Sequence, residues 1–259
     1  MLHRPFGDLR VPAPSPHNAP PAAATPRVQQ IVDALRGDIT RGELAPHTPL
    51  PSERAVAEVH GVSRMTARRA LERIEAEGLA YSAERRGRFV SPGRLSYNIS
   101  DRLGFTADAR DAGVALEIEL IDVDTTPATE AHAAQLGIDR GDSLYTYTRL
   151  FRSAGHATFI ETESVIAARF PELLSHDLRQ STTQLWEQHY GTHADTGDIV
   201  IRLCALRESE AALLGLAPHH PVIELKQITR DRDGAPFCLG RQIWRGEMAE
   251  FVAYAKVNQ

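Results

Sequence analysis

A succession of helix caps and turn residues between residues 50 and 90 constrains the fold of this chain more than any other feature. Ser52 precedes a short helical run and is a favoured N-cap, because its side chain can accept a hydrogen bond from a free amide of the first turn. Gly61 follows that run as a turn residue, and Ser63 is a second N-cap. Gly78 ends the second run. The sequence therefore predicts two short helices joined by a tight turn.

Another helix is predicted ahead of this pair, from about Arg27 to Arg41, with Gly42 at its end. Its apolar side chains recur at helical spacing and form one stripe. They are Val28, Ile31, Val32, Leu35 and Ile39. We expect this stripe to pack against the two helices that follow.

The helix after Ser63 has two chemically different sides. At about 100° per residue, its small and apolar residues share one arc that predicts the packed side. They are Ala67, Ala70, Leu71 and Ile74. Arg68 and Arg69 fall on the opposite side, and Arg64 lies at the N-terminal edge. A recognition helix needs this arrangement, because its N-terminal residues reach base edges in the major groove. Arginine can pair there with guanine through two hydrogen bonds.

A basic hairpin is predicted next, with strands over residues 79–82 and 88–90 and a connection over residues 83–87. Three arginines surround Gly87, and they suit a phosphate backbone or a minor groove. They are Arg85, Arg86 and Arg88. Gly87 permits close approach of the backbone. Helix-turn-helix geometry also occurs in proteins that never bind DNA, but caps, turn, stripe and basic hairpin in this order favour a winged module that binds double-stranded DNA.

The charge distribution agrees with this interpretation. The whole chain has a net charge of −5, which is unusual for a DNA-binding protein. However, residues 27–94 hold 12 arginines and 9 acidic residues, a net charge of +3, whereas residues 95–259 carry −9. Attraction to phosphate acts within about 8–10 Å at moderate salt, so the local charge decides it.

The length of 259 residues fits two domains. Residues 1–26 are rich in proline and predict a disordered tail. We expect a DNA-binding domain over residues 27–92 and a second domain over residues 93–259.

Several classes of protein are disfavoured by what the sequence lacks. The two cysteines, Cys204 and Cys238, have no metal-type spacing, so we expect no metal site, no disulfide scaffold and a reducing cytoplasm. His189 and His193 are four residues apart, but Gly191 between them would break a helix. No apolar run is long enough for a membrane helix, so we expect no membrane association. No glycine-rich nucleotide loop is present, and we expect no cofactor. No nucleophile elbow is present either, and we expect no enzyme activity.

The motifs LPSER, GVSRMTARRALERIEAEGL and RRGRFV resemble the winged helix-turn-helix of the GntR family of bacterial transcription regulators. The resemblance covers about residues 26–92. It implies DNA contacts by Arg54, Arg64, Thr66, Arg68, Arg86 and Gly87. We expect Arg64 and Arg68 to read bases, and Arg54, Arg86 and Arg88 to hold phosphates. At Arg88 the chain departs from the family, which usually has threonine after the wing glycine.

The second half contains a faint internal repeat. Residues 133–138 (AAQLGI) match residues 211–216 (AALLGL), and a strand-like run follows each, over residues 143–150 and 222–228. Each unit reads as short helix, strand, turn and strand. Two such units predict an antiparallel sheet with a cleft between its halves, and clefts of this kind are common ligand sites.

Residues 95–257 resemble the UTRA effector domain of HutC-like GntR regulators, most of all regulators of the PhnF type, which act in phosphonate utilisation. The resemblance rests on Tyr97, Arg102, Phe105-Thr106, Gly113, Leu136-Gly137, Phe170-Pro171, Tyr190-Gly191 and Arg245-Gly246-Glu247. It implies an α+β protein whose C-terminal domain has a chorismate-lyase-like fold without the lyase activity.

Candidate effector-binding residues follow from chemistry. The planar forks of Arg149, Arg152 and Arg241 suit carboxylate, phosphate or phosphonate. Thr106 lies near an expected helix start, where amides and a hydroxyl can hold an anion, and Glu161 can accept an amine or hydroxyl. The resemblance places Arg149, Glu161 and Thr106 at or next to ligand-contacting positions. Each charged residue could equally form an ordinary surface ion pair.

One further departure from the family narrows the ligand class. Cys238-Leu239 stands where the family often has Glu-Tyr, a polar pair used to bind amino-sugar phosphates. The replacement argues against that class of ligand.

These observations favour a ligand-responsive repressor that binds operator DNA as a homodimer and is released by a small anionic metabolite. Two alternatives stay open. One is an enzyme of lyase-like fold with a DNA-binding appendage, and the other is an architectural DNA-binding protein without a ligand. The sequence leaves open whether a ligand releases or promotes DNA binding.

Overall fold

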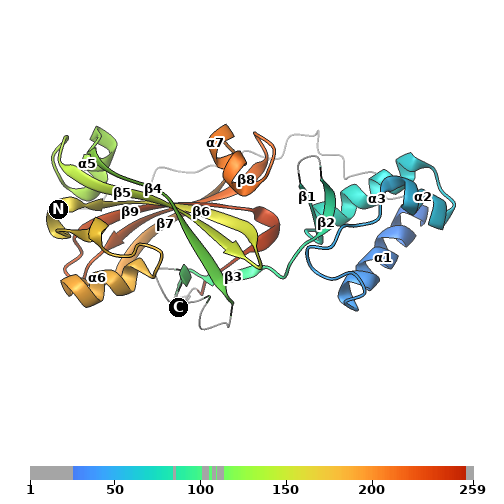
Figure 1. The fold of residues 1–259 in the computed structure, drawn as a ribbon, viewed down its shortest axis with the longest axis horizontal. Coiled ribbons are helices and arrows are strands. Elements are labelled where there is room, and N and C mark those ends of the chain that lie inside the picture. Colours follow the sequence, from blue (N-terminus) through green and yellow to red (C-terminus); the bar gives the residue numbers. More distant parts are fainter. Residues whose placement is uncertain (1–25, 84–85, 101–104, 107–108, 110–113, 255–259) are drawn as a thin grey trace, which may run out of the picture.

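The computed structural model describes residues 26–83, 86–100, 105–106, 109 and 114–254. A helical N-terminal part with a small hairpin stands beside a larger part built on a six-stranded sheet (Figure 1). Apart from Pro26, the tail expected over residues 1–26 lies outside the described residues.

The N-terminal part has the elements that the caps predict. They are α1 (Pro26–Thr40), α2 (Glu53–His60), α3 (Arg64–Ala76), β1 (Ala80–Ala83) and β2 (Gly87–Val90). The side chain of Ser52 accepts a hydrogen bond from the amide of Ala55, and Ser63 caps α3 in the same way. Gly61 adopts φ of 60°, a left-handed conformation that ends α2. Strands β1 and β2 pair antiparallel and form the wing.

Helix α3 buries the arc that its periodicity predicts. Its four core residues are at most 1% exposed. They pack with the predicted stripe of α1, including Ile31 and Val32, and with Val56 of α2. Full burial of an aliphatic side chain contributes about 1.5–3 kcal/mol, so this cluster holds the three helices together.

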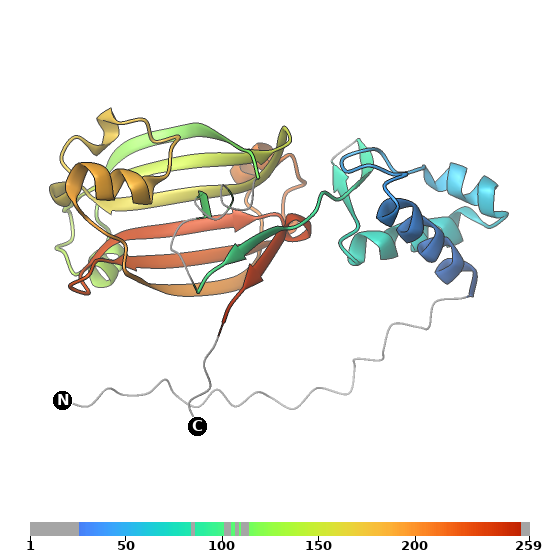
Figure 2. The same ribbon diagram turned by 90° about the horizontal axis from the view of Figure 1, so that it is seen from below.

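The second part is an antiparallel sheet with strand order β4-β5-β6-β9-β8-β7 (Figure 2). Its strands are β4 (Leu116–Pro127), β5 (Ser143–Ser153), β6 (His156–Ile166), β7 (Thr196–Ala205), β8 (Pro221–Arg230) and β9 (Pro236–Trp244). Helix α5 (Glu130–Leu136) precedes β5, and α7 (Glu208–Leu214) precedes β8. The predicted repeat of helix, strand, turn and strand is therefore present twice, and the two halves meet where β6 pairs with β9.

Helices cover the two faces of the sheet unequally. Helices α5 and α7 lie on one face, and α6 (Thr182–Tyr190) lies on the other (Figure 1). On that second face, toward the N-terminal part, β3 (Leu95–Asn98) pairs parallel with β10 (Ala249–Val252). Aromatic rings fill the space below them, where Phe159 stacks on Trp244 with centroids 3.9 Å apart. The fold is therefore α+β, as predicted, with a winged helix-turn-helix followed by an antiparallel-sheet domain.

Two expected absences concern membranes and metals. Among the described residues, no helix is both long and apolar enough to cross a bilayer. His189 lies in α6 and His193 beyond the cap residue Gly191, and the described part of the chain contains no group of three His, Cys, Asp or Glu side chains that could hold a metal ion.

Candidate nucleic-acid interface and ligand pocket

The outward face of α3 carries the predicted recognition residues. Arg64 and Arg68 are exposed, as is Met65 beside them at 58%. The Nε of Arg68 lies 2.8 Å from Oε1 of Glu72 one turn later. This exposed ion pair contributes little to stability, so the guanidinium can exchange its partner for a base at low cost.

Arg54 and Thr66 differ in how free they are to contact DNA. Arg54 projects from α2 with its side chain 72% exposed and lies 3.5 Å from Glu58. Thr66 is half-buried, and its hydroxyl lies 2.9 Å from the Ser63 hydroxyl. Thr66 therefore supports the N-cap of α3, and its hydroxyl is already engaged.

Arg86 and Arg88 of the wing have different surroundings, although the sequence predicts phosphate contacts for both. Arg86 is exposed, and its guanidinium lies 5.4 Å from the centre of the Phe89 ring. Gly87 adopts φ of +98°, and no described residue lies within 4 Å of where its side chain would stand. Arg88 instead turns back into the domain, 3.4 Å from Glu53 and 3.2 Å from Glu75. Arg86 is therefore exposed and, among the described residues, in no ion pair, whereas Arg88 is engaged in two, contrary to the role expected for it. Arg85 lies outside the described residues.

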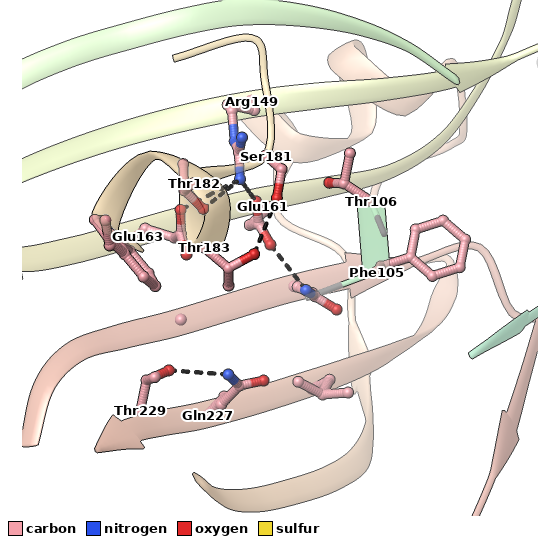
Figure 3. A pocket seen from close by; sticks show the side chains of 14 residues that line it. Phe105, Thr106, Arg149, Glu161, Glu163, Ser181, Thr182, Thr183, Gln227 and Thr229 are labelled. Carbon is pink, nitrogen blue, oxygen red and sulfur yellow. Dashed lines mark hydrogen bonds and ion pairs between the residues drawn. The ribbon is translucent and has the colours of Figure 1, made fainter. Parts of the chain in front are cut away.

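A narrow polar pocket lies between the sheet and the start of α6 (Figure 3). Both halves of the sheet contribute, as a cleft between repeats requires. Its lining is Phe105, Thr106, Arg149, Glu161, Glu163, Ser181, Thr182, Thr183, Trp186, Leu225, Gln227, Thr229, Gly240 and Gln242. The cavity is about 20 Å³, which is room for about one water molecule. A metabolite can enter this pocket only if lining groups move.

Arg149 is the central cation of the pocket and is 2% exposed. One end of its guanidinium donates to the carbonyl oxygens of Leu178 and Gln180, at 3.0 and 2.9 Å. The other end pairs with Glu161, which faces it across β5 and β6, and lies 3.2 Å from Glu163. Burial alone would lower the pKa of Arg149, but the two carboxylates together outweigh burial and raise it. Arg149 is therefore charged at every relevant pH.

Glu163 is a buried carboxyl of the pocket with a raised pKa. Burial raises the pKa of Glu163 to about 7, and the charge of Glu161 adds to this effect while Arg149 opposes it. The Sγ of Cys238 lies 3.8 Å from Oε1 of Glu163. The second carboxyl of the pocket thus titrates near neutral pH.

Some buried donors of the pocket have no hydrogen-bond partner among the described residues. These are Nε of Arg149 and Nε1 of Trp186. Buried polar atoms are nearly always paired in native proteins, so unpaired donors in a pocket wall suggest acceptor atoms of a ligand or water.

Thr106 and Glu161 line the pocket with Arg149, whereas the other two predicted arginines lie elsewhere. Arg241 precedes Gln242 on β9, so its side chain points to the opposite face of the sheet. There it pairs with Glu210 of α7 and Glu224 of β8, at 2.5 and 2.6 Å. Arg152 lies 3.4 Å from Glu119 on the neighbouring strand β4. We therefore remove Arg152 and Arg241 from the candidate site.

Sequence reasoning missed the hydroxyl-rich start of α6. Ser181, Thr182 and Thr183 line the pocket, and Ser181 is the N-cap of the helix. The signal was available, because three hydroxyl residues before Leu185 and Trp186 are a helix-start pattern. It also missed Gln242, whose amide donates to Glu161 at 2.8 Å.

Comparison with known families decides the classification of the chain. Residues 27–90 match the gntR family of bacterial regulatory proteins, and residues 111–250 match the UTRA domain. The chain belongs to the GntR family. Both matches agree with the resemblances found in the sequence, and the second covers the sheet domain that holds the pocket.

Relatives match along most of their length. The chain is 31% identical over 229 residues to the transcriptional repressor NagR of Bacillus subtilis, covering 88% of this chain and 94% of NagR. It is 28% identical to the transcriptional repressor PhnF of Mycolicibacterium smegmatis, covering 90% and 95%. The crystal structure of PhnF from Mycobacterium smegmatis superposes with a TM-score of 0.63 at 24% identity, covering 88% of this chain and 100% of that one. This similarity confirms the two-domain fold.

Proposed function

We propose that this GntR-family protein is a dimeric repressor that binds operator DNA and is released by a small anionic metabolite. The observation that carries the proposal is the outward face of α3, where Arg64 and Arg68 stand exposed on a helix whose other face is fully buried. The named repressors NagR and PhnF, which match nearly end to end, support it. A regulator of this kind acts where the chromosome is, in the cytoplasm.

In this proposal α3 enters the major groove, and Arg64 and Arg68 read base edges. Arg54 on α2 and Arg86 at the wing hold phosphates on either side, with Gly87 allowing close approach. Thr66 and Arg88 act indirectly, because Thr66 supports the α3 cap and Arg88 ties the wing to Glu53 and Glu75.

We assign dimerisation to the effector domain, at strand β7. This strand is an edge of the sheet, and its hydrogen-bonding partner among the described residues is β8 alone. Val200 and Leu203 are 58% and 78% exposed. A long edge strand with exposed apolar side chains is a ready surface for a second copy of the chain.

The effector proposal rests on three features of the pocket: the unpaired donors Nε of Arg149 and Nε1 of Trp186, the hydroxyls of Ser181 and Thr182, and the positive end of the α6 dipole. An anionic group suits all three. A phosphonate, phosphate ester or carboxylate fits the small cavity only after lining side chains have moved. Such a ligand would therefore bind the rearranged state more tightly than the closed state, and it would shift the equilibrium between the two.

The decisive experiment is fluorescence anisotropy on DNA from upstream of the gene of this protein, with a panel of phosphonates, phosphorylated sugars and carboxylates. We expect tight binding that one compound relieves. Thr182→Val is the matched pocket variant, because it replaces the hydroxyl with a methyl group and keeps the branched shape of the side chain. It should bind DNA normally and respond less to the compound. Tight DNA binding that no compound shifts, with no compound bound by calorimetry, would contradict the effector proposal.

An enzyme of lyase-like fold is the second candidate, and Glu163 is the observation in its favour. A buried carboxyl with a pKa near 7 is suited to general acid–base work. Incubation of the bound compound with stoichiometric protein, followed by NMR of the compound, separates the two. A regulator returns the compound unchanged, whereas an enzyme converts it.

A further inference from the structure

The two parts of the chain meet at a small cluster of rings. His47 lies in the loop between α1 and α2, and His156 begins β6; their rings are parallel within 5°, with centroids 3.5 Å apart. Nδ1 of His47 lies 3.0 Å from the hydroxyl of Tyr81 on the wing strand β1. The guanidinium of Arg245 lies 4.5 Å from the centre of the Tyr81 ring. We refer to His47, Tyr81, His156 and Arg245 as the clasp.

Each side of the clasp is anchored in its own domain. Arg245 is 4% exposed, its amide donates to the carbonyl of Thr158 at 3.1 Å, and its Nη2 lies 2.8 Å from Glu247. On the other side, the amide of His47 donates to the carbonyl of Val90 at the end of the wing. The clasp therefore joins two frameworks, each of which is held by hydrogen bonds in its own domain.

The strands that form the clasp also form the pocket. Arg149 on β5 and Glu161 on β6 face each other in the pocket, and the same hairpin turns at Ser153–His156. Glu161 also accepts a hydrogen bond from Gln242, three residues before Arg245 on the same stretch of chain. Glu161 is therefore connected to His156 along β6 and to Arg245 through Gln242 on β9.

We propose that His156 and Arg245 are positioning residues, which hold the winged helix in the DNA-binding orientation until a ligand in the pocket shifts strands β5, β6 and β9. This inference rests on the proposed function, because it assigns the route by which the pocket controls the DNA-binding domain. The two recognition helices of a dimer must match two half-sites at a fixed separation. A fixed orientation of the winged helices increases the affinity for DNA, because less conformational freedom is lost on binding.

The charges around the clasp keep its imidazoles neutral. Burial lowers the pKa of His47 to about 4, helped by the neighbouring His156 and Arg245. Burial also lowers the pKa of His156, with Arg245, Arg86 and Arg152 adding repulsion. Glu247 is the acidic group that faces this site through Arg245 and Tyr81. Because the closed form binds fewer protons, the clasp is stable above pH about 6.5 and weakens as the pH falls toward about 4.

Hydrogen exchange on the full-length protein tests the contact without DNA or ligand. His156→Ala should speed amide exchange several-fold in residues 43–50 of the opposite domain. His156→Phe keeps a planar ring and should exchange like the wild type. His193→Ala, which loses a contact with Glu187 away from the clasp, is the control. Faster exchange confined to the β5–β6 turn would overturn the proposal.

The titration of His47, followed by NMR, reports on the stacked contact from the side of the DNA-binding domain. In His156→Ala the pKa of His47 should rise from about 4 toward its ordinary value of 6.5, because loss of the stacked ring exposes His47 to water. In His156→Phe it should stay low, since the ring still buries His47. An unchanged His47 titration in His156→Ala would count against the stacked contact.

DNA binding gives the functional readout at neutral pH. His156→Ala should bind an operator with two half-sites about 3–10-fold more weakly, because the second contact becomes less pre-organised, and bind a single half-site as the wild type does. Equal affinity of the wild type and this variant for both DNAs would refute the positioning role. If the wild type binds no DNA, the proposed function fails, and the exchange and titration results still decide the clasp.

Discussion

Single residues of the same type have separate tasks in this protein. Arg86 and Arg88 are two positions apart on one hairpin, yet Arg86 is exposed and Arg88 pairs with Glu53 and Glu75 inside the domain. A guanidinium binds phosphate readily only when little free energy is lost on breaking its ion pairs within the protein. Residue type and position in a motif therefore do not fix the role, and the acidic neighbours decide it.

The salt dependence of DNA binding distinguishes these two arginines. Arg86→Ala should weaken binding to specific and random DNA alike and lower the slope of log affinity against log salt by about one unit. Arg88→Ala should leave the slope unchanged and cost up to about 1 kcal/mol of stability for each lost ion pair. Titrations at several salt concentrations measure the slope, and urea unfolding measures the stability. A reduced slope for Arg88→Ala would return it to the DNA-contacting set.

Glu163 gives the effector domain a pH-dependent stability. Its pKa in the folded protein is about 7, above the ordinary value of 4.5, so the folded state binds the extra proton between these values. Its contribution is therefore fully present below pH about 4.5 and is lost as the pH rises through about 7. Glu163→Gln mimics the protonated form and should gain stability relative to the wild type between pH 5 and pH 8. Denaturant unfolding at both values checks this, and a constant difference would contradict it.

Arg149 requires a different kind of test from the other pocket residues. Arg149→Ala would leave Glu161 and Glu163 buried without their cation, which costs about 3–5 kcal/mol in comparable buried pairs. A lost effector response in such a variant would therefore not separate loss of ligand binding from destabilisation of the fold. Thr182→Val is therefore the informative substitution in this pocket.

At the scale of elements, local signals predicted helices well and strand faces poorly. Caps at Ser52 and Ser63 and the stripe of α1 are local, and the structure confirms the three helices. Arg149 and Arg241 looked equivalent as strand arginines, but they point to opposite faces. Side chains alternate along a strand, so the face depends on which partner strand and layer each side meets. That information comes from tertiary packing and is absent from a local pattern.

The edge strand β7 carries the prediction about assembly. Leu203 is 78% exposed on a strand with a free edge, so Leu203→Lys should weaken the dimer by about 2 kcal/mol, or about 30-fold. Val123→Lys on the opposite edge strand β4, where the side chain is 38% exposed, is the matched control and should leave the dimer intact. Sedimentation equilibrium measures both. Dissociation by the β4 variant instead would move the interface to the other edge.

At the scale of the whole molecule, the two domains differ in net charge and are joined by the clasp. The winged helix carries +3 and approaches DNA, whereas residues 95–259 carry −9 and are repelled by it. The acidic domain therefore favours an orientation in which only the winged helices face the duplex. In our proposal the clasp sets this orientation. A ligand in the pocket, far from α3, can therefore change the affinity for DNA.

The spacing of operator half-sites tests that rigidity in the assembled dimer. Inserting five base pairs between half-sites rotates one to the opposite side of the duplex, and inserting ten restores the side but lengthens the separation by about 34 Å. A dimer with clasped domains should fall to half-site affinity with both insertions. His156→Ala, with its domains released, should recover part of its affinity with ten base pairs but not with five. Recovery by the wild type on the ten-base-pair insertion would mean that its winged helices move independently, and anisotropy titrations of both proteins on the three DNAs decide it.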